Sequence, residues 1–130
     1  MSIQLVIGVL LALSGVMLGA FGAHGLKSIL DSAALNTFEI GVRYQLYHGL
    51  AILMLAGLTQ RASSRWCIRA ANFFITGCVL FSGSLYLLVL TGHKWLGPVT
   101  PLGGVCLMLG WLCVLMALIK GKERAGPPAP

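Results

Sequence analysis

Charged side chains are scarce in this sequence. Of 130 residues, nine are Lys or Arg and three are Asp or Glu, so 9% of the chain is charged. An ordinary soluble domain carries about 25% charged residues. The chain is also 58% hydrophobic, with a mean hydropathy of +0.91. This composition excludes an ordinary soluble domain, because so short a chain could not cover itself with polar surface, and lipid is the expected solvent for much of it.

Acidic residues are the rarest charged type, and none lies in a long hydrophobic run. Asp31 and Glu39 fall in one connection and Glu123 in the tail. No carboxylate is therefore expected inside a membrane span to abstract or relay a proton. The Ser82-Gly83-Ser84 string lies in a predicted helix and lacks the strand-to-helix turn of a nucleophile elbow. We expect no enzyme activity, no catalytic residue and no cofactor.

Cysteine is also sparse, with four residues and no CxxC pair. Metal sites use tighter clusters of ligands, usually with His close by in the chain. We therefore expect no metal ion, and interpret the cysteines as small apolar packing residues. They are Cys67, Cys78, Cys106 and Cys113.

Long uncharged runs are what the sequence has instead. A helix needs about 20 apolar residues to cross roughly 30 Å of hydrocarbon. Three runs are long enough outright, and the second, Tyr44 to Gln60, is extended by a helix that begins near Ser32 with Asp31 or Ser32 as its N-cap. The predicted spans are Ile3–Ala23, Gly41–Thr59, Ala70–Thr91 and Thr100–Ile119.

The predicted fold class is all-α: an integral membrane four-helix bundle with an interfacial segment, His24 to Ile40, between helices one and two. The first span lacks the basic start of a signal peptide and exceeds its usual apolar length, so we expect it to stay. Residues 1–121 form the predicted membrane domain. Residues 122–130 form a Pro-rich, disordered cytoplasmic tail, since Pro cannot continue a helix.

The basic residues predict the orientation. Six lie in the loop between spans two and three and in the tail, whereas three lie on the opposite side. The side richer in Lys and Arg is normally cytoplasmic, so both termini are predicted there, in a bacterial inner membrane. Contact with anionic lipid headgroups accounts for the net charge of +6, and no nucleic-acid partner is expected.

Glycines form a second pattern. Gly15 and Gly19 make a GxxxG string on the first span, and Gly103 and Gly110 are seven residues apart on the fourth. Small residues let membrane helices approach closely. These glycines form either a homo-oligomer face or the packing inside one bundle; the second is favoured because four helices already offer many internal contacts.

Polar side chains gather toward the predicted outer side. Counting at 1.5 Å per residue from the outer ends of the spans places them at similar depth in the outer leaflet. They serve either as hydrogen bonds that lock the helices together, or as a site in which His24 and His48 bind a proton, a metal ion or a lipid headgroup. The candidate residues are His24, Tyr44, Gln45, His48, Ser82, Ser84 and Thr100.

Four strings in this order resemble a known family. They are Gly19 to Leu26 (GAFGAHGL), Tyr44 to Ala51 (YQLYHGLA), Leu80 to Tyr86 (LFSGSLY), and Thr100 to Gly104 (TPLGG) followed by Gly110-Trp111. The chain is similar to the bacterial domain-of-unknown-function 423 family, also called uncharacterised protein family 0382, whose relatives include the eukaryotic transmembrane protein 256 family. The resemblance implies a small multi-pass inner-membrane protein and implies no activity.

Three classes of function follow. The first, which we favour from the sequence, is a non-enzymatic accessory protein that binds itself or a larger membrane complex through its glycine faces. The second is a small transport or channel-like protein, which would need an oligomer. The third binds an ion, a lipid or another small ligand at the His, Tyr and Ser cluster. In every class the lipid bilayer is the immediate partner.

Overall fold

The computed structural model describes residues 1–122, and over that range all regular structure is helical. The predicted all-α class is confirmed. The tail predicted to be disordered lies outside the described residues from position 123 onward. The helices are α1 (Ser2–Phe21), the π-helical turn η1 (Gly22–Leu26), α2 (Ser32–Leu58), α3 (Ser64–Thr91), the 3₁₀ turn η2 (Lys94–Leu96) and α4 (Val99–Lys120).

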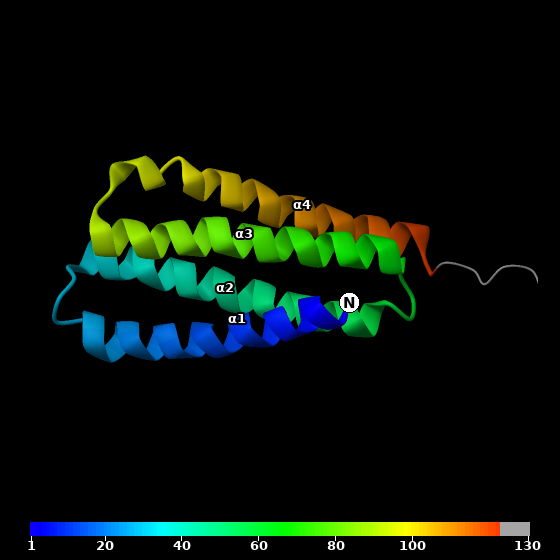
Figure 1. Cartoon of the computed structure of the whole chain (residues 1–130), viewed down its shortest axis with the longest axis horizontal. Coiled ribbons are helices and arrows are strands. Elements are labelled where there is room, and N and C mark those ends of the chain that lie inside the picture. Colours follow the sequence, from blue (N-terminus) through cyan, green and yellow to red (C-terminus); the bar gives the residue numbers. More distant parts are fainter. Residues whose placement is uncertain (123–130) are drawn as a thin grey trace, which may run out of the picture.

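The four long helices lie side by side in chain order, each antiparallel to the next (Figure 1). α1 packs on α2, α2 on α3, and α3 most extensively on α4, with only a small contact between α1 and α3. α4 therefore rests almost entirely on α3. The start of α1 and the end of α4 lie toward the same end of the bundle (Figure 1).

Three helical segments are long and apolar enough to cross a membrane: Ser2–Leu26, Ser64–Thr91 and Lys94–Lys120. The chain is thus a membrane helix bundle. α2, predicted to span over Gly41–Thr59, is long enough but is not among the three, because Glu39, Arg43 and several polar residues lower its hydropathy. Its place between α1 and α3 surrounds it with apolar helices, so its polar side chains can face protein.

Local signals fix the helix ends. The carboxylate of Asp31 accepts a 2.7 Å hydrogen bond from the amide of Ala34 and caps α2, as the sequence predicts. α3 ends at Gly92, whose left-handed φ of 73° is readily adopted by glycine. The expected interfacial segment is short: residues 27–31 link η1 to α2, and residues 32–40 already belong to α2.

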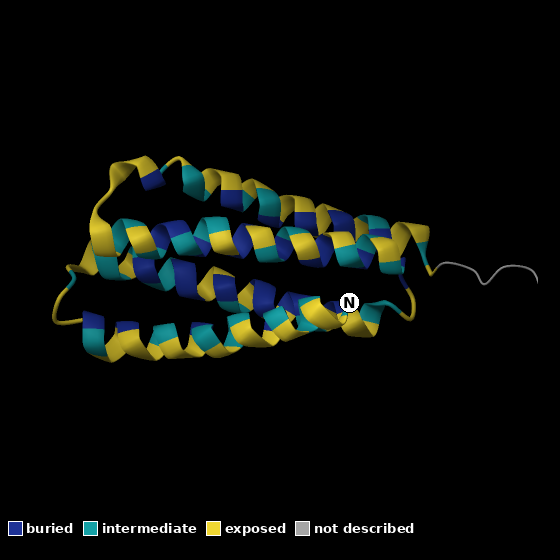
Figure 2. Ribbon diagram, in the orientation of Figure 1, coloured by how far each residue is buried: buried dark blue, intermediate teal, exposed yellow. Residues whose placement is uncertain are grey.

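Large apolar side chains cover the outside of the bundle, and Figure 2 shows many exposed positions along α1 and α4. On α1, for example, Leu10, Leu13 and Met17 are each more than half exposed. In water such a surface would drive aggregation, whereas in a bilayer it faces hydrocarbon. The interior is filled by a few fully buried side chains, among them Phe38, Ile52, Leu55 and Phe74.

The four glycines singled out in the sequence all lie between helices of the same chain. A Cβ on Gly15 would meet Leu46, and one on Gly19 would meet Val42, both on α2. On α4, Gly103 sits against the backbone of Phe81 and Gly110 against the ring of Phe74. These glycine faces therefore bring neighbouring helices of one bundle together.

Candidate functional site

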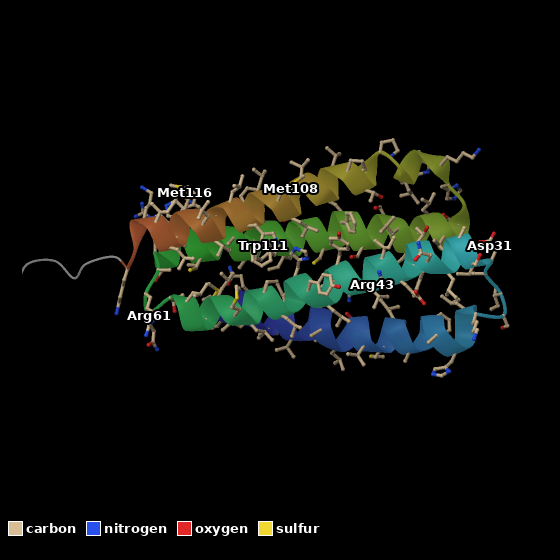
Figure 3. All side chains as sticks on the ribbon, turned by 180° about the vertical axis from the view of Figure 1, so that it is seen from behind. Asp31, Arg43, Arg61, Met108, Trp111 and Met116 are labelled. Atoms are coloured by element: carbon tan, nitrogen blue, oxygen red, sulfur yellow. The ribbon has the colours of Figure 1, made fainter. Side chains whose placement is uncertain are left out.

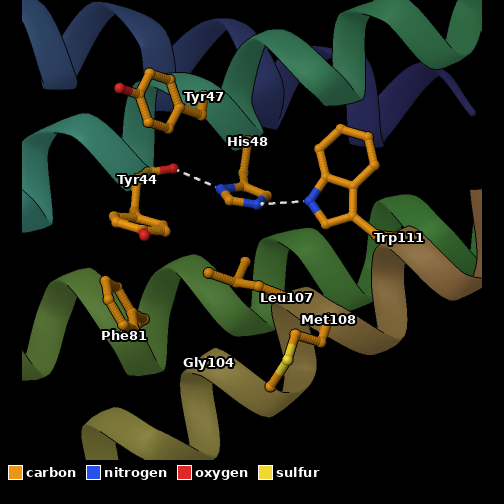
Figure 4. A pocket seen from close by; sticks show the side chains of 8 residues that line it. All are labelled: Tyr44, Tyr47, His48, Phe81, Gly104, Leu107, Met108 and Trp111. Atoms are coloured by element: carbon orange, nitrogen blue, oxygen red, sulfur yellow. Dashed lines mark hydrogen bonds between the residues drawn. The ribbon is translucent and has the colours of Figure 1, made fainter.

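His48 joins α2 to α4. Its side chain is buried, and its Nδ1 lies 2.7 Å from the carbonyl oxygen of Tyr44 one turn earlier. Its Nε2 lies 3.0 Å from the indole Nε1 of Trp111 on α4 (Figure 4). Because a carbonyl can only accept and an indole N–H can only donate, the ring is neutral with its proton on Nδ1. Both ring nitrogens are occupied.

His48 lies deeper in the bundle than the sequence suggested. It is sixteen residues from the start of α2 and ten from its end, or about 24 Å and about 15 Å along the axis. Its ring packs on Phe74, 5.2 Å away, in the middle part of α3. The first turns of α2 run beside η1, where Phe38 contacts Gly22, so His48 lies farther from that end of the bundle than a count from Gly41 suggested.

Gln45 is the hub of a second set of hydrogen bonds. Its Nε2 donates to the carbonyl of Leu11, at 2.9 Å, and to the hydroxyl of Ser14, at 2.7 Å, both on α1. Its Oε1 accepts from the phenol of Tyr86 on α3 at 2.7 Å. One side chain thus links three helices, and the buried amide is satisfied at both its oxygen and its nitrogen, as the cost of an unpaired amide in an apolar medium requires.

Ser82, Ser84 and Thr100 form two further links near the η2 end of the bundle. The Ser82 hydroxyl donates to the carbonyl of Gly41 on α2 at 2.6 Å, and the Ser84 and Thr100 hydroxyls are 2.6 Å apart between α3 and α4. These residues make separate interhelical bonds and do not converge on one centre.

His24 and His48, which one of the two interpretations of the polar cluster paired in a binding site, do not lie together. His24 lies in η1 and is exposed. Its neighbour Gly22 is level with Phe38, and the ten residues between Phe38 and His48 correspond to about 15 Å along α2. The same error in depth is the cause, since counting α2 from Gly41 brought the two histidines to one level. Within residues 1–122, no group of three or more His, Cys, Asp or Glu side chains is placed to hold a metal ion.

Sequence reasoning missed three partners: Ser14, Tyr86 and Trp111. Trp111 entered the sequence analysis only as part of the family motif Gly110-Trp111, although an indole N–H within a hydrophobic span needs an acceptor. That need indicated a polar partner for Trp111, but the depth expected for His48 did not place the two side chains at one level. Ser14 and Tyr86 carried no comparable signal, since a Ser or Tyr can bond its own backbone or reach the interface.

A groove lies between α2 and α4, with Phe81 of α3 in its wall, and the His48–Trp111 bond closes one side of it (Figure 4). Its volume is about 530 Å³. Aromatic rings make much of the wall, and the ring of Tyr44 packs on that of Phe81 with centroids 4.7 Å apart. The groove is lined by Tyr44, Tyr47, His48, Phe81, Gly104, Leu107, Met108 and Trp111.

The groove opens in the plane of the membrane. Tyr47, Met108 and Trp111 are 56%, 60% and 44% exposed, on helices whose outer surfaces face lipid. Within residues 1–122, no hydrogen bond engages the phenol hydroxyl of Tyr44 or Tyr47. The groove is therefore largely apolar, with the phenols of Tyr44 and Tyr47 in its lining, and no carboxylate or cation lines it.

Four antiparallel helices, apolar outer faces and buried interhelical hydrogen bonds define a small multi-pass membrane protein. The family described as "Protein of unknown function (DUF423)" matches residues 18–104. The chain belongs to this family, and the predicted resemblance is confirmed. The matched range contains most of the groove lining but not Leu107, Met108 or Trp111.

Relatives from several bacteria match most of the chain. The UPF0382 membrane protein YwdK of Bacillus subtilis is 39% identical over 121 residues, covering 92% of this chain and 98% of its own. The UPF0382 inner membrane protein YgdD of Escherichia coli K12 is 42% identical over 116 residues, covering 87% and 88%. No solved structure matches. These names support a membrane protein and give no activity.

Proposed function

We propose that this protein is a non-enzymatic membrane protein that binds the apolar chain of a lipid or a lipid-like ligand in the groove between α2 and α4. The observation that carries the proposal is a groove of about 530 Å³ that opens laterally to the bilayer. Its volume falls within the roughly 300–1,000 Å³ of typical ligand sites. The ligand would enter from the membrane plane without crossing water.

The polar groups of the groove favour a ligand that carries a hydrogen-bond acceptor as well as an apolar chain. The phenols of Tyr44 and Tyr47 lie within about one helical turn of each other and lack partners within residues 1–122. A hydroxyl left unpaired in an apolar medium costs free energy. An ester or ketone oxygen on the ligand would remove that cost and fix the position of the chain.

Binding is a better fit than catalysis for this groove. Both ring nitrogens of His48 are engaged, so the ring is not free to accept a proton from a ligand without losing the Trp111 bond. The lining includes no carboxylate and no cysteine. His48 and Trp111 would instead hold the wall in shape.

The self-associating role that the sequence favoured loses its main support. It rested on glycine faces, yet Gly15 and Gly19 contact α2, and Gly103 and Gly110 contact α3, within one chain. The lipid-facing side of α1 carries large side chains such as Leu10 and Leu13. Close approach of a second copy is therefore not favoured there.

The proposal is tested by native mass spectrometry of protein released from mild detergent. Gly104→Leu fills the groove from one side, because a Cβ on Gly104 would lie 3.8 Å from the Phe81 ring, an ordinary contact. Gly57→Leu is the matched control, since no atom lies within 4 Å of a Cβ there. We expect Gly104→Leu to retain one lipid-like ligand fewer than the parent and the Gly57→Leu protein. Equal retention in all three would refute the groove as the binding site.

A further inference from the structure

A second depression lies on α3 and α4 and shares no lining residue with the groove. It has a volume of about 220 Å³. Three polar side chains of α3 follow one another along it at positions 69, 72 and 76, so they lie on one helical stripe. It is lined by Arg69, Asn72, Phe73, Thr76 and Cys106.

The polar groups of this depression are hydrogen-bond donors without acceptors. The guanidinium of Arg69 lies 4.6 Å above the ring of Trp66. This cation–π contact positions the guanidinium but leaves its N–H donors without an acceptor. The Oδ1 atom of Asn72 accepts from Gln4 at 3.2 Å, which leaves its amide hydrogens as donors. Within residues 1–122, no acceptor is bonded to these hydrogens, to Arg69 or to the Thr76 hydroxyl.

Charge at this end of the bundle has one sign among the described residues. Arg61, Arg65 and Arg69 belong to the α2–α3 connection and the first turns of α3, and Lys120 and Lys122 lie at the end of α4. Figure 3 shows Arg61 at this end and Asp31 at the opposite one. Glu39 is paired with Arg43, away from this end. No carboxylate within residues 1–122 is therefore available to Arg69.

We propose that this depression binds one anionic phospholipid of the adjacent leaflet. Arg69 holds the phosphate, and Asn72 and Thr76, deeper along α3, donate to the glycerol-ester oxygens. Arg suits this role because its planar fork binds two phosphate oxygens at once. The order of the residues matches the lipid: the cation lies nearest the end of the bundle, and the neutral donors lie toward the hydrocarbon.

The test uses the full chain in nanodiscs of phosphatidylcholine with a minor fraction of phosphatidylglycerol, followed by native mass spectrometry of the released protein. Arg69→Gln removes the phosphate contact, and Arg61→Gln is the matched control, with the same charge change at the same end but outside the depression. We expect Arg69→Gln to lower retained phosphatidylglycerol about five- to tenfold, from the worth of one basic residue at a lipid surface. Arg61→Gln should lower it much less, because Arg61 lies outside the depression and contributes only diffuse attraction to the lipid surface.

Two further variants keep the proposal falsifiable. Arg69→Lys retains the positive charge but loses the planar guanidinium that binds two phosphate oxygens. It should retain an amount of phosphatidylglycerol between those of the parent and Arg69→Gln. Thr76→Val, nearly equal in volume, should lower retention of both lipids. Equal losses in Arg69→Gln and Arg61→Gln would overturn the site in favour of diffuse charge attraction. Displacement of the lipid by millimolar inorganic phosphate would overturn it in favour of a free anion.

This inference does not depend on the groove. Gly104→Leu fills the groove and leaves the depression untouched, since Gly104 is not among its lining residues. Phosphatidylglycerol should therefore stay bound to Gly104→Leu and be lost selectively from Arg69→Gln. Loss of phosphatidylglycerol from Gly104→Leu instead would show that the lipid occupies the groove and would overturn the second site.

Discussion

At the scale of single residues, four buried polar side chains, those of Gln45, His48, Ser82 and Ser84, bond to neighbouring helices. His48 bonds to Trp111, Gln45 to Ser14 and Tyr86, and the hydroxyls of Ser84 and Thr100 to each other. Each bond satisfies groups that hydrocarbon cannot. Within residues 1–122, the two groove phenols and the donors of the Arg69 depression have no such partner, and these groups mark the candidate ligand sites.

Trp111→Phe should destabilise the bundle by about 1 kcal/mol, the usual worth of a side-chain hydrogen bond between membrane helices. The substitution keeps an aromatic ring but removes the donor to His48. The free energy of unfolding can be measured by titration with sodium dodecyl sulfate in mild detergent. Trp95→Phe is the control, because Trp95 is 68% exposed. Equal effects of the two substitutions would mean that the His48 bond adds nothing to stability.

The residues of the candidate site were only partly predictable from the sequence. That Gln45 and His48 must face protein follows from the cost of leaving their polar groups unpaired in lipid. Their partners do not follow, because pairing depends on the register between helices, which the spans fix only to within a few residues. An error of that size is enough to place His48 at the level of His24 in the prediction and to miss Trp111 as its partner.

At the scale of helices and their contacts, close approach at glycine sets the α3–α4 interface. A Cβ on Gly103 would lie 2.3 Å from the backbone nitrogen of Phe81 and 2.7 Å from its Cα. Neither atom can move without moving α3. The interface with the most extensive contact in the bundle thus depends on the absence of one methyl group.

Gly103→Ala should therefore separate α3 from α4 and cost about 3 kcal/mol or more, the upper range for overpacking. Gly83→Ala is the control on α3, since nothing lies within 4 Å of its added Cβ. That change should be neutral or stabilising by about 0.5–1 kcal/mol, because alanine favours a helix over glycine. Unfolding titrations of both proteins check the pair, and a tolerated Gly103→Ala would contradict the observed α3–α4 packing.

At the scale of the whole molecule, the fold was predictable to a useful degree. Long uncharged runs and a helix that begins at Asp31 and Ser32 are enough for four helices in an antiparallel bundle. The lateral groove was not predictable. It arises because α4 rests on α3 and reaches α2 mainly through the Trp111–His48 bond, an arrangement that span boundaries do not encode.

The orientation of the molecule is a further prediction. The end that carries Arg61, Arg65 and Lys120 should be cytoplasmic, because basic residues accumulate on that side. Topology reporters fused after residue 122 and within residues 27–31 should give cytoplasmic and periplasmic signals respectively. A reversed pair of signals would contradict the assignment and would place the Arg69 depression in the other leaflet.

The most direct test of the groove is photolabelling with a lipid that carries a diazirine in its acyl chain, followed by peptide mapping. The account predicts labels concentrated on Tyr44, Tyr47 and Met108, and their loss in Gly104→Leu but not in Gly57→Leu. Labels spread evenly over the exposed faces of α1 and α4, unchanged by Gly104→Leu, would show that the groove binds no lipid acyl chain specifically. That result would contradict the proposed function.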